Sequence, residues 1–355
     1  MLIEELLELA TYKKASDLHI SAGLPPIIRI DGRLIRLEYD VLSSDDIESL
    51  VFPMLTNEQR RRLEQEWELD FSYGVQGLSR FRVNVYKDKG SYAAAFRTIN
   101  SIAPTFDELG LPEIVKKISD RPRGLVLVTG PTGSGKSTTL ATMIDYINST
   151  RAEHILTIED PIEFVHKSKK SIIHQRELGQ DTRSFSNALR SALREDPDVI
   201  LVGEMRDLDT IRLAITAAET GHLVFGTLHT SSASQTIDRI IDVFPEGQQQ
   251  QVRIQLSTSL VAVLSQTLLP RLMPDGTKKG RILAQEIMIV NPAIANLIRE
   301  SKAAQIYSTI QTNQGIGMQT LEMSLKELYK SKKISLEDAL SKSSRPEELK
   351  RLLQP

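Results

Sequence analysis

A glycine-rich loop in the middle of the chain carries the residues best suited to chemistry. The run GPTGSGKST fits the pattern GxxxxGK[ST], with the apolar run GLVLVTG before it and the helical pattern TTLATMIDYI after it. Glycines let backbone amides close on phosphate oxygens, and the helix N-terminus adds its positive end. We expect the loop to bind ATP with Mg²⁺, with Lys136 at the β- and γ-phosphates and the Ser137 hydroxyl at the metal. The expected loop residues are Gly130, Pro131, Thr132, Gly133, Ser134, Gly135, Lys136, Ser137 and Thr138.

A second candidate is the carboxylate at the end of the buried strand pattern DVILVGE. Glu204 stands where the Walker B acid of such enzymes holds Mg²⁺, usually through water, although Asp is the more common residue there. The alternative is a strand-end acid that caps the next helix.

Three more carboxylates, Glu159, Asp160 and Glu163, follow the apolar run HILTI. They should lie just past the carboxyl end of a strand, where ligands bind in open α/β sheets. One of them could orient or deprotonate the attacking water, but the residue pattern does not choose among them, and a solvated acidic turn is the alternative for each.

Two histidines and three arginines are further candidates. His222 and His229 bracket the run LVFGTL, so they should lie at the two ends of one strand, too far apart to share a metal. Each is either functional or a satisfied structural histidine. Arg80, Arg82 and Arg97 could stabilise transferred phosphoryl charge or could be solvated strand residues.

The elements that must position these residues form an α/β domain at 113–355. Short, β-branched apolar runs alternate with helical patterns such as 185–194 and 208–219, which predicts a mostly parallel sheet covered on both faces. After Gln248 we expect helix as far as Leu268, then a hairpin at 274–276 and terminal helices with caps at Ser335 and Ser344. The strand runs lie at 124–130, 154–160, 170–178, 198–204 and 223–229.

The preceding segment reads differently, as a small α+β module at 1–99. It mixes one helical segment with alternating stretches, separated by the turn pairs Pro25-Pro26 and Asp31-Gly32. Residues 100–112 suit an interdomain linker because they carry two prolines and a glycine among polar residues. The strand candidates lie at 17–21, 27–30, 69–73, 79–86 and 92–98.

Composition narrows the functional classes. A length of 355 residues fits two domains, and a net charge of −2 without a basic run argues against a partner nucleic acid. The absence of cysteine excludes disulfides and cysteine-based zinc sites. No signal-peptide pattern opens the chain, and the longest apolar run, 260–269, is broken by Ser and Gln. We therefore expect a cytoplasmic protein whose membrane association, if any, is peripheral.

Four segments together resemble the secretion ATPase superfamily: GPTGSGKST, ILTIEDPIEF, LREDPDVILVGEMRD and TGHLVFGTLHT, in this order. The N-terminal runs ASDLHISAGLPPIIRIDGRL and SRFRVNVYKDKGSYAAAFRTI are similar to the PAS-like domain of its pilus retraction members. The resemblance implies a RecA-like P-loop ATPase domain preceded by a PAS-like domain, assembled as a ring of six. It also implies that ATP binds between the two domains, and that closure about residues 100–112 produces torque.

The resemblance assigns roles to the open candidates. It makes Glu163 the catalytic carboxylate, Glu204 the Walker B acid, and His222 and His229 histidines near the phosphates. Arg80, Arg82 and Arg97 become arginines that approach the nucleotide from the N-terminal domain. The implied partners are an inner-membrane platform protein of the PilC type and, indirectly, pilin, at the cytoplasmic face of the inner membrane.

Two features bear on which member of the superfamily this is. Assembly and secretion members usually carry a four-cysteine zinc motif, so the lack of cysteine favours retraction over assembly. The retraction members carry a segment AIRNLIRE, whereas this chain reads AIANLIRE, with Ala295 in place of arginine. Rival interpretations are a nucleic-acid translocase, a small-molecule kinase and a scaffold that binds ATP without hydrolysing it.

Overall fold

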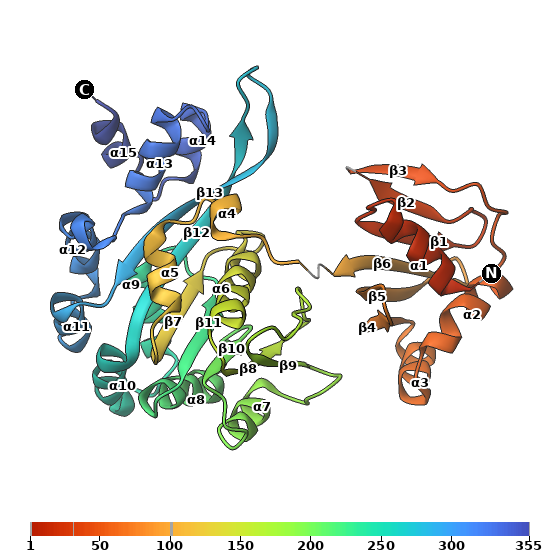
Figure 1. The fold of residues 1–355 in the computed structure, drawn as a ribbon, viewed down its shortest axis with the longest axis horizontal. Coiled ribbons are helices and arrows are strands. Elements are labelled where there is room, and N and C mark those ends of the chain that lie inside the picture. Colours follow the sequence, from red (N-terminus) through yellow and green to blue (C-terminus); the bar gives the residue numbers. More distant parts are fainter. Residues whose placement is uncertain (1, 31, 100–101, 355) are drawn as a thin grey trace. The chain divides into compact units, whose positions relative to one another are not determined.

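The chain forms two compact units in the computed structural model, which describes residues 2–30, 32–99 and 102–354 (Figure 1). The first unit comprises Met1–Ile102 together with Pro161–Val165, and the second comprises Ala103–Asp160 and His166–Pro355. Asp31 of the expected turn pair and residues 100 and 101 of the expected linker lie outside the described residues.

An antiparallel sheet with helices on one face makes up the first unit. Phe81, Val83 and Val85 point into the core, where Leu6 of α1 and Ile47 of α2 pack against them. The alternation leaves Arg80 and Arg82 on the opposite face of the same strand. The described residues of this unit form three α-helices where one helical segment was expected. Capping boxes at Ser43 and Thr56 start two of them. The strand order is β3-β2-β1-β6-β5-β4.

The elements of this unit are α1 (Ile3–Tyr12), β1 (Asp17–Ser21), β2 (Ile27–Ile30), β3 (Arg33–Arg36), α2 (Ser44–Val51), α3 (Asn57–Glu66), β4 (Glu68–Val75), β5 (Ser79–Asp88) and β6 (Ser91–Ile99).

A seven-stranded sheet, ordered β13-β12-β7-β11-β10-β8-β9, forms the centre of the second unit. Every neighbouring pair is parallel except β12 with β13, so the predicted mostly parallel α/β sheet is confirmed. Its strands are β7 (Gly124–Thr129), β8 (His154–Glu159), β9 (Ile172–Glu177), β10 (Val199–Val202), β11 (Leu223–Leu228), β12 (Leu260–Leu272) and β13 (Lys278–Ile289).

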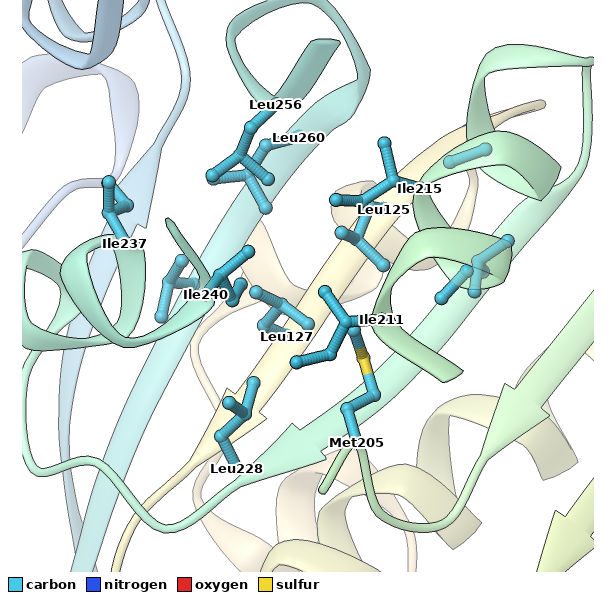
Figure 2. Close-up of a cluster of buried hydrophobic side chains, with 14 of the residues drawn as sticks. Leu125, Leu127, Met205, Ile211, Ile215, Leu228, Ile237, Ile240, Leu256 and Leu260 are labelled. Carbon is cyan, nitrogen blue, oxygen red and sulfur yellow. The ribbon is translucent and has the colours of Figure 1, made fainter. Parts of the chain in front are cut away.

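Helices cover both faces of this sheet. Strand β7 is buried along its whole length and sends alternate side chains into two cores, Leu125 and Leu127 into one, Val126 and Val128 into the other. Figure 2 shows the first core, where Leu125 and Leu127 reach toward helices α8 and α9. Each fully buried aliphatic side chain contributes about 1.5–3 kcal/mol, so the strand that leads to the glycine-rich loop is firmly held.

The helices of the second unit are α4 (Phe106–Leu109), α5 (Glu113–Ser119), α6 (Lys136–Thr150), α7 (Phe185–Ala192), α8 (Leu208–Glu219), α9 (Ala233–Asp242), α10 (Glu246–Ser259), α11 (Pro292–Arg299), α12 (Ile306–Thr312), α13 (Leu321–Lys330), α14 (Leu336–Lys342) and α15 (Pro346–Leu353).

The chain after Gln248 departs from expectation. Helix α10 ends at Ser259 and the apolar run that follows is strand β12, so the predicted helix to Leu268 is wrong. A short apolar run fits a buried helix and a buried strand equally well, and here pairing with β7 and β13 decides for the strand. The hairpin at 274–276 and the cap at Ser335 are confirmed, whereas Arg345 stands at the N-cap predicted for Ser344.

Among the residues that the structure describes, no helix combines the length and apolar character needed to cross a bilayer.

Candidate active site

The glycine-rich loop lies between the carboxyl end of β7 and the first turn of α6, as the sequence predicts. Gly130, Gly133 and Gly135 all have positive φ, which turns the backbone sharply from strand into helix. The Lys136 ammonium lies across the loop and donates to the carbonyl oxygens of Gly130 at 2.8 Å and Pro131 at 3.2 Å. A loop of backbone amides with a lysine at a helix N-terminus is suited to bind a polyphosphate.

Position 130 requires glycine for two reasons, its φ of 140° and the close approach of β12. A Cβ at this position would lie 2.3 Å from the carbonyl oxygen of Gln266 on β12, closer than any side chain tolerates. The loop therefore rests directly on β12.

Glu204 follows β10 and interacts with two cationic or ionisable side chains. Its carboxylate accepts hydrogen bonds from Arg206 Nε at 2.6 Å and from His229 Nε2 at 3.0 Å. The Arg206 hydrogen bond lowers the pKa of Glu204 by more than burial raises it, and the charges of Arg206 and His229 add to the lowering. Glu204 is therefore ionised at neutral pH, as a metal-holding acid must be.

The peptide that carries Glu204 is fixed by its neighbours. Gly203 packs against β8, where a Cβ would lie 3.0 Å from the Ile158 carbonyl oxygen. The Thr227 hydroxyl donates to the Gly203 carbonyl, and the Met205 amide donates to the Thr227 carbonyl at 3.1 Å. Because β7, β10 and β11 are parallel, Glu204 leaves the sheet at the same edge as the glycine-rich loop.

The residues at this edge fit Mg²⁺. The cation prefers oxygen ligands and usually combines one or two protein groups with water and substrate phosphates. The Ser137 hydroxyl in the first turn of α6 and the ionised Glu204 carboxylate are oxygen donors of this kind. These two side chains would hold the metal.

The two histidines are separated by the strand between them. His229 follows β11 and reaches Glu204, whereas His222 precedes β11, and its Nδ1 lies 2.9 Å from the Ala217 carbonyl oxygen at the end of α8. The amide of Gly124, at the start of β7, donates to the His222 carbonyl at 3.0 Å. The fold thus places His222 at the sheet edge opposite the glycine-rich loop of its own chain, away from the expected position near the phosphates.

The three clustered carboxylates have different surroundings. Glu159 is partly buried and accepts hydrogen bonds from the Thr157 hydroxyl at 2.7 Å and from Gln175 Nε2 at 3.2 Å. Asp160 and Glu163 are exposed. Glu163 lies in Pro161–Val165 and so belongs to the first unit. These contacts give Glu159 a structural role in the sheet and leave the other two better suited to act on a ligand.

The three arginines all lie on the sheet of the first unit. Arg82 and Arg97 are register partners on β5 and β6, and Arg80 lies two residues before Arg82. Arg97 Nε donates to Asp17 at 2.9 Å, while Arg82 Nε lies 3.9 Å from Asp70. The predicted site residues are therefore divided, with the glycine-rich loop, Glu204 and His229 in the second unit and the arginines with Glu163 in the first.

Two residues of the site were missed from the sequence. Arg206, which fixes Glu204, stands in the segment LREDPDVILVGEMRD, yet nothing in that pattern marks it as a partner of the acid. Gln266 supports the loop from β12, and its signal was present as a polar residue in an otherwise apolar run.

Comparison with known proteins agrees with this geometry. The family model described as Type II/IV secretion system protein matches residues 1–340. The chain is 57% identical to the type IV pilus retraction ATPase PilT of Pseudomonas aeruginosa, over 97% of this chain and 99% of the relative. It is 55% identical to a twitching motility protein of Neisseria gonorrhoeae, over 91% of this chain and 86% of the relative.

Two solved structures are also similar to this chain. A crystal structure of the pilus retraction motor PilT with bound ADP is similar with a TM-score of 0.91 and 52% sequence identity, covering 99% of both chains. The ATPase DotB of Legionella pneumophila is similar with a TM-score of 0.81 and 28% identity, covering 95% of this chain and 93% of that one.

Proposed function

Because the chain belongs to the Type II/IV secretion system protein family, we propose that it is an ATP-hydrolysing motor that powers the retraction of type IV pili. The chain is an ATPase of this family. The observation that carries the proposal is near-full-length similarity to a pilus retraction ATPase, combined with a complete phosphate loop and an ionised Glu204 at one sheet edge.

Binding is assigned to the second unit. The loop amides and the helix α6 N-terminus hold the phosphates, and the Lys136 ammonium leaves the carbonyls of Gly130 and Pro131 to pair with the β- and γ-phosphates. Ser137 and Glu204 would hold Mg²⁺, which would neutralise the charge that develops on the phosphate oxygens. His229 keeps the Glu204 carboxylate oriented by donating to it.

Hydrolysis also needs groups that act on the attacking water and on the γ-phosphate. We assign the first role to Glu163, an exposed carboxylate that lacks the structural hydrogen bonds of Glu159. Arg80, Arg82 and Arg97 are assigned to the transferred phosphoryl charge, in line with the use of arginine for that purpose. Support for both assignments comes from the similarity to the retraction ATPase.

The working assembly is assigned as a ring of six copies. It acts on an inner-membrane platform protein at the cytoplasmic face of the membrane, and through that protein on pilin. No nucleic acid takes part, in keeping with the net charge of −2.

The first experiment measures ATPase activity against protein concentration, with mass by light scattering, for the chain and for Glu163→Gln, with and without DNA. Activity that rises as six-subunit particles form, ignores DNA and is lost in Glu163→Gln supports the motor. Full activity from a monomer, or activity that requires DNA, would contradict it.

A second experiment tests the biological direction. The chain is expressed in a bacterium that lacks its own retraction ATPase, and both twitching and surface pili are measured. Restored twitching with fewer surface pili is expected. Ala295 is half-buried on α11, so Ala295→Arg is the matched variant for the one departure from the retraction segment. If neither chain restores twitching while both hydrolyse ATP, retraction is the wrong assignment.

A further inference from the structure

We infer that Gln266 of β12 is a positioning residue for the phosphate loop, one that fixes the direction in which the loop amides point. The inference rests on the proposed ATP site and adds to it a residue far from the loop in sequence. Gln266 is 3% exposed, so its side chain contacts protein rather than solvent.

One hydrogen bond and two close approaches join Gln266 to the loop. Its Nε2 donates a hydrogen bond to the Ser134 carbonyl at 3.0 Å. A Cβ added to Gly130 would lie 2.3 Å from the Gln266 carbonyl oxygen, and a Cβ added to Gly135 would lie 3.4 Å from its Nε2. Gln266 therefore lies against both ends of the segment that joins β7 to α6.

The orientation of the Gln266 amide is fixed chemically. A backbone carbonyl only accepts, so the nitrogen of the amide must face Ser134. The Oε1 on the other side accepts from the Thr139 hydroxyl at 3.2 Å and from Gln285 Nε2 at 3.1 Å. Thr139 is 1% exposed and Gln285 2% exposed, so both partners are themselves buried and hold the side chain in one rotamer.

This hydrogen bond determines where a loop amide points. In a trans peptide the C=O and the following N–H lie in one plane and point in opposite directions. Tying the Ser134 carbonyl to β12 therefore aims the Gly135 N–H away from β12, and we assign this amide to a phosphate oxygen. An amide held this way needs no reorganisation when a phosphate oxygen arrives, which is the advantage of preorganised binding.

Support from β12 continues one residue earlier. The Ser265 hydroxyl lies 2.8 Å from the Thr129 hydroxyl at the last residue of β7, and both are buried. Ser265 and Gln266 thus hold the strand end and the loop from opposite faces of β12, because successive strand residues point to opposite faces.

The test compares affinity for Mg·ADP in the full chain, using a fluorescent ADP analogue, for wild type, Gln266→Met and Gln266→Glu. Gln266→Met keeps the volume but removes the donor, and at least a tenfold weaker affinity is expected with a folded protein by circular dichroism. Asn148→Leu is the matched control, because Asn148 is a buried amide near the far end of α6, where it donates to the Lys167 carbonyl and accepts from the Lys169 amide, away from the loop.

Gln266→Glu supplies a readout that a packing role would not move. A protonated glutamic acid can donate to the Ser134 carbonyl, whereas a carboxylate repels it. The ratio of variant to wild-type Kd should therefore fall toward one as the pH is lowered from 8.5 to 6, and taking the ratio cancels the titration of ADP itself.

The possible outcomes distinguish failure of the Gln266 positioning role from failure of the proposed ATP site. Wild-type affinity in Gln266→Met, or a pH-independent ratio in Gln266→Glu, overturns the positioning role while leaving the ATP site intact. Failure of the wild type to bind Mg·ADP overturns the proposed ATP site. If Gln266→Met does not fold, the pH dependence of Gln266→Glu decides alone.

Discussion

Glu204 and His229 form a hydrogen-bonded pair from two neighbouring strand ends, and Arg206 completes the group. A carboxylate in this setting keeps its charge and its direction, because two donors fix the same oxygen. With Glu204 in its proposed role at the metal, we propose that the imidazole acts on the nucleotide through Glu204, which would make His229 a positioning residue.

The two histidines around β11 provide a matched pair of variants. His229→Ala should lower kcat by at least about tenfold, because Glu204 loses one of its two partners, and His222→Ala should leave it within about twofold of wild type. Steady-state ATP hydrolysis with thermal stability as the control checks this. An equal loss in His222→Ala would show that the far edge of the sheet also contributes to turnover.

A second titratable group lies deeper, on β13. Glu286 accepts the Ala233 amide at 2.7 Å at the start of α9. Burial raises the pKa of Glu286 to about 7, the Ala233 hydrogen bond and Arg345 work against this, and Glu322 adds to it. Between pH 4.5 and about 7, Glu286 therefore keeps its proton in the folded chain, whereas in the unfolded chain, where its pKa is near 4.5, it has released the proton.

The sign of the resulting pH dependence follows from linkage. Between pH 4.5 and about 7 the folded state binds the extra proton, so the free energy of unfolding falls as pH rises, by about 3 kcal/mol in all. Above about 7 the contribution stays constant. Glu286→Gln should lack this loss, so urea unfolding at pH 5.5 and 8 should show a smaller drop for the variant. Parallel drops in the two proteins would show that Glu286 does not titrate in this range.

Sequence identified the residues whose motifs are local and missed those whose partners are distant. The phosphate loop is a contiguous pattern, and Glu204 ends a recognisable strand. Gln266 supports the loop through β12, and no spacing rule connects residues that meet only because β7 and β12 are neighbours. The residue pattern could not choose the catalytic carboxylate among Glu159, Asp160 and Glu163. The choice depends on which of them already makes structural hydrogen bonds within the sheet, as Glu159 does.

Two glycines of the loop between β7 and α6 are required for different reasons, Gly133 for its backbone conformation alone and Gly130 also for lack of space. Gly133 has a φ of 78° with nothing within 4 Å of a Cβ, whereas Gly130 would meet the Gln266 carbonyl at 2.3 Å. Gly133→Ala should cost about 1–2 kcal/mol of stability from backbone strain alone, and Gly130→Ala at least about 2 kcal/mol more from the clash. Thermal unfolding without nucleotide compares them. Equal losses would mean that the loop shifts off β12 at little cost.

One buried carboxylate, Glu322, joins several segments of the C-terminal region to one another. Glu322 on α13 is fully buried and accepts from Tyr307, from the hydroxyls of Ser343 and Ser344, and from the Arg345 amide. These bonds hold the segment between α14 and α15 against α13, and Ser344 contributes here instead of capping α15.

Replacing this carboxylate should release the end of the chain. Glu322→Leu removes the acceptor of four donors, of which the Tyr307 hydroxyl belongs to a buried residue, and should cost about 1–3 kcal/mol, whereas Glu322→Gln keeps an acceptor and should cost less. Hydrogen exchange of 343–354 is the measurement, with faster exchange expected in Glu322→Leu only. Unchanged protection would assign the segment's stability to Leu349 and the apolar contacts around it.

Helices and strands were predicted correctly where the hydrophobic pattern and the turn residues on both sides indicated the same element. The five predicted strands of the α/β domain are present, because continuous apolar runs bounded by polar turns have one good solution in a covered sheet. Strand β12 was missed because its pairing with the long antiparallel strand β13 stabilises it, and the residue pattern of β12 alone does not predict this pairing. Helix α3 of the first unit was missed because it is polar on most of its surface and buries a single residue, Leu63.

Considered as a whole, the molecule distributes its site residues over two separately packed units. Each unit has its own core, and the loop with Glu204 belongs to one while the arginines with Glu163 belong to the other. Under the proposed assignments neither unit alone contains all of the hydrolytic residues, and we predict that turnover requires residues of both. The resemblance found in the sequence already implied this dependence, and it stays a prediction, because burial and pairing within each unit do not test assembly.

Mixing two inactive variants tests that dependence. Lys136→Ala removes the phosphate contact in the second unit, and Arg82→Ala removes an exposed arginine whose ion pair with Asp70 spans 3.9 Å, so the first unit should keep its fold. We expect each variant alone to lose at least about tenfold in turnover and their mixture to recover activity, because an intact arginine of one copy then serves the intact loop of another. ATP hydrolysis across mixing ratios is the measurement. Recovery that peaks at intermediate ratios requires catalysis shared between copies, whereas a flat, inactive series would place Arg82 in service of its own chain's nucleotide and make the ring necessary for force but not for chemistry.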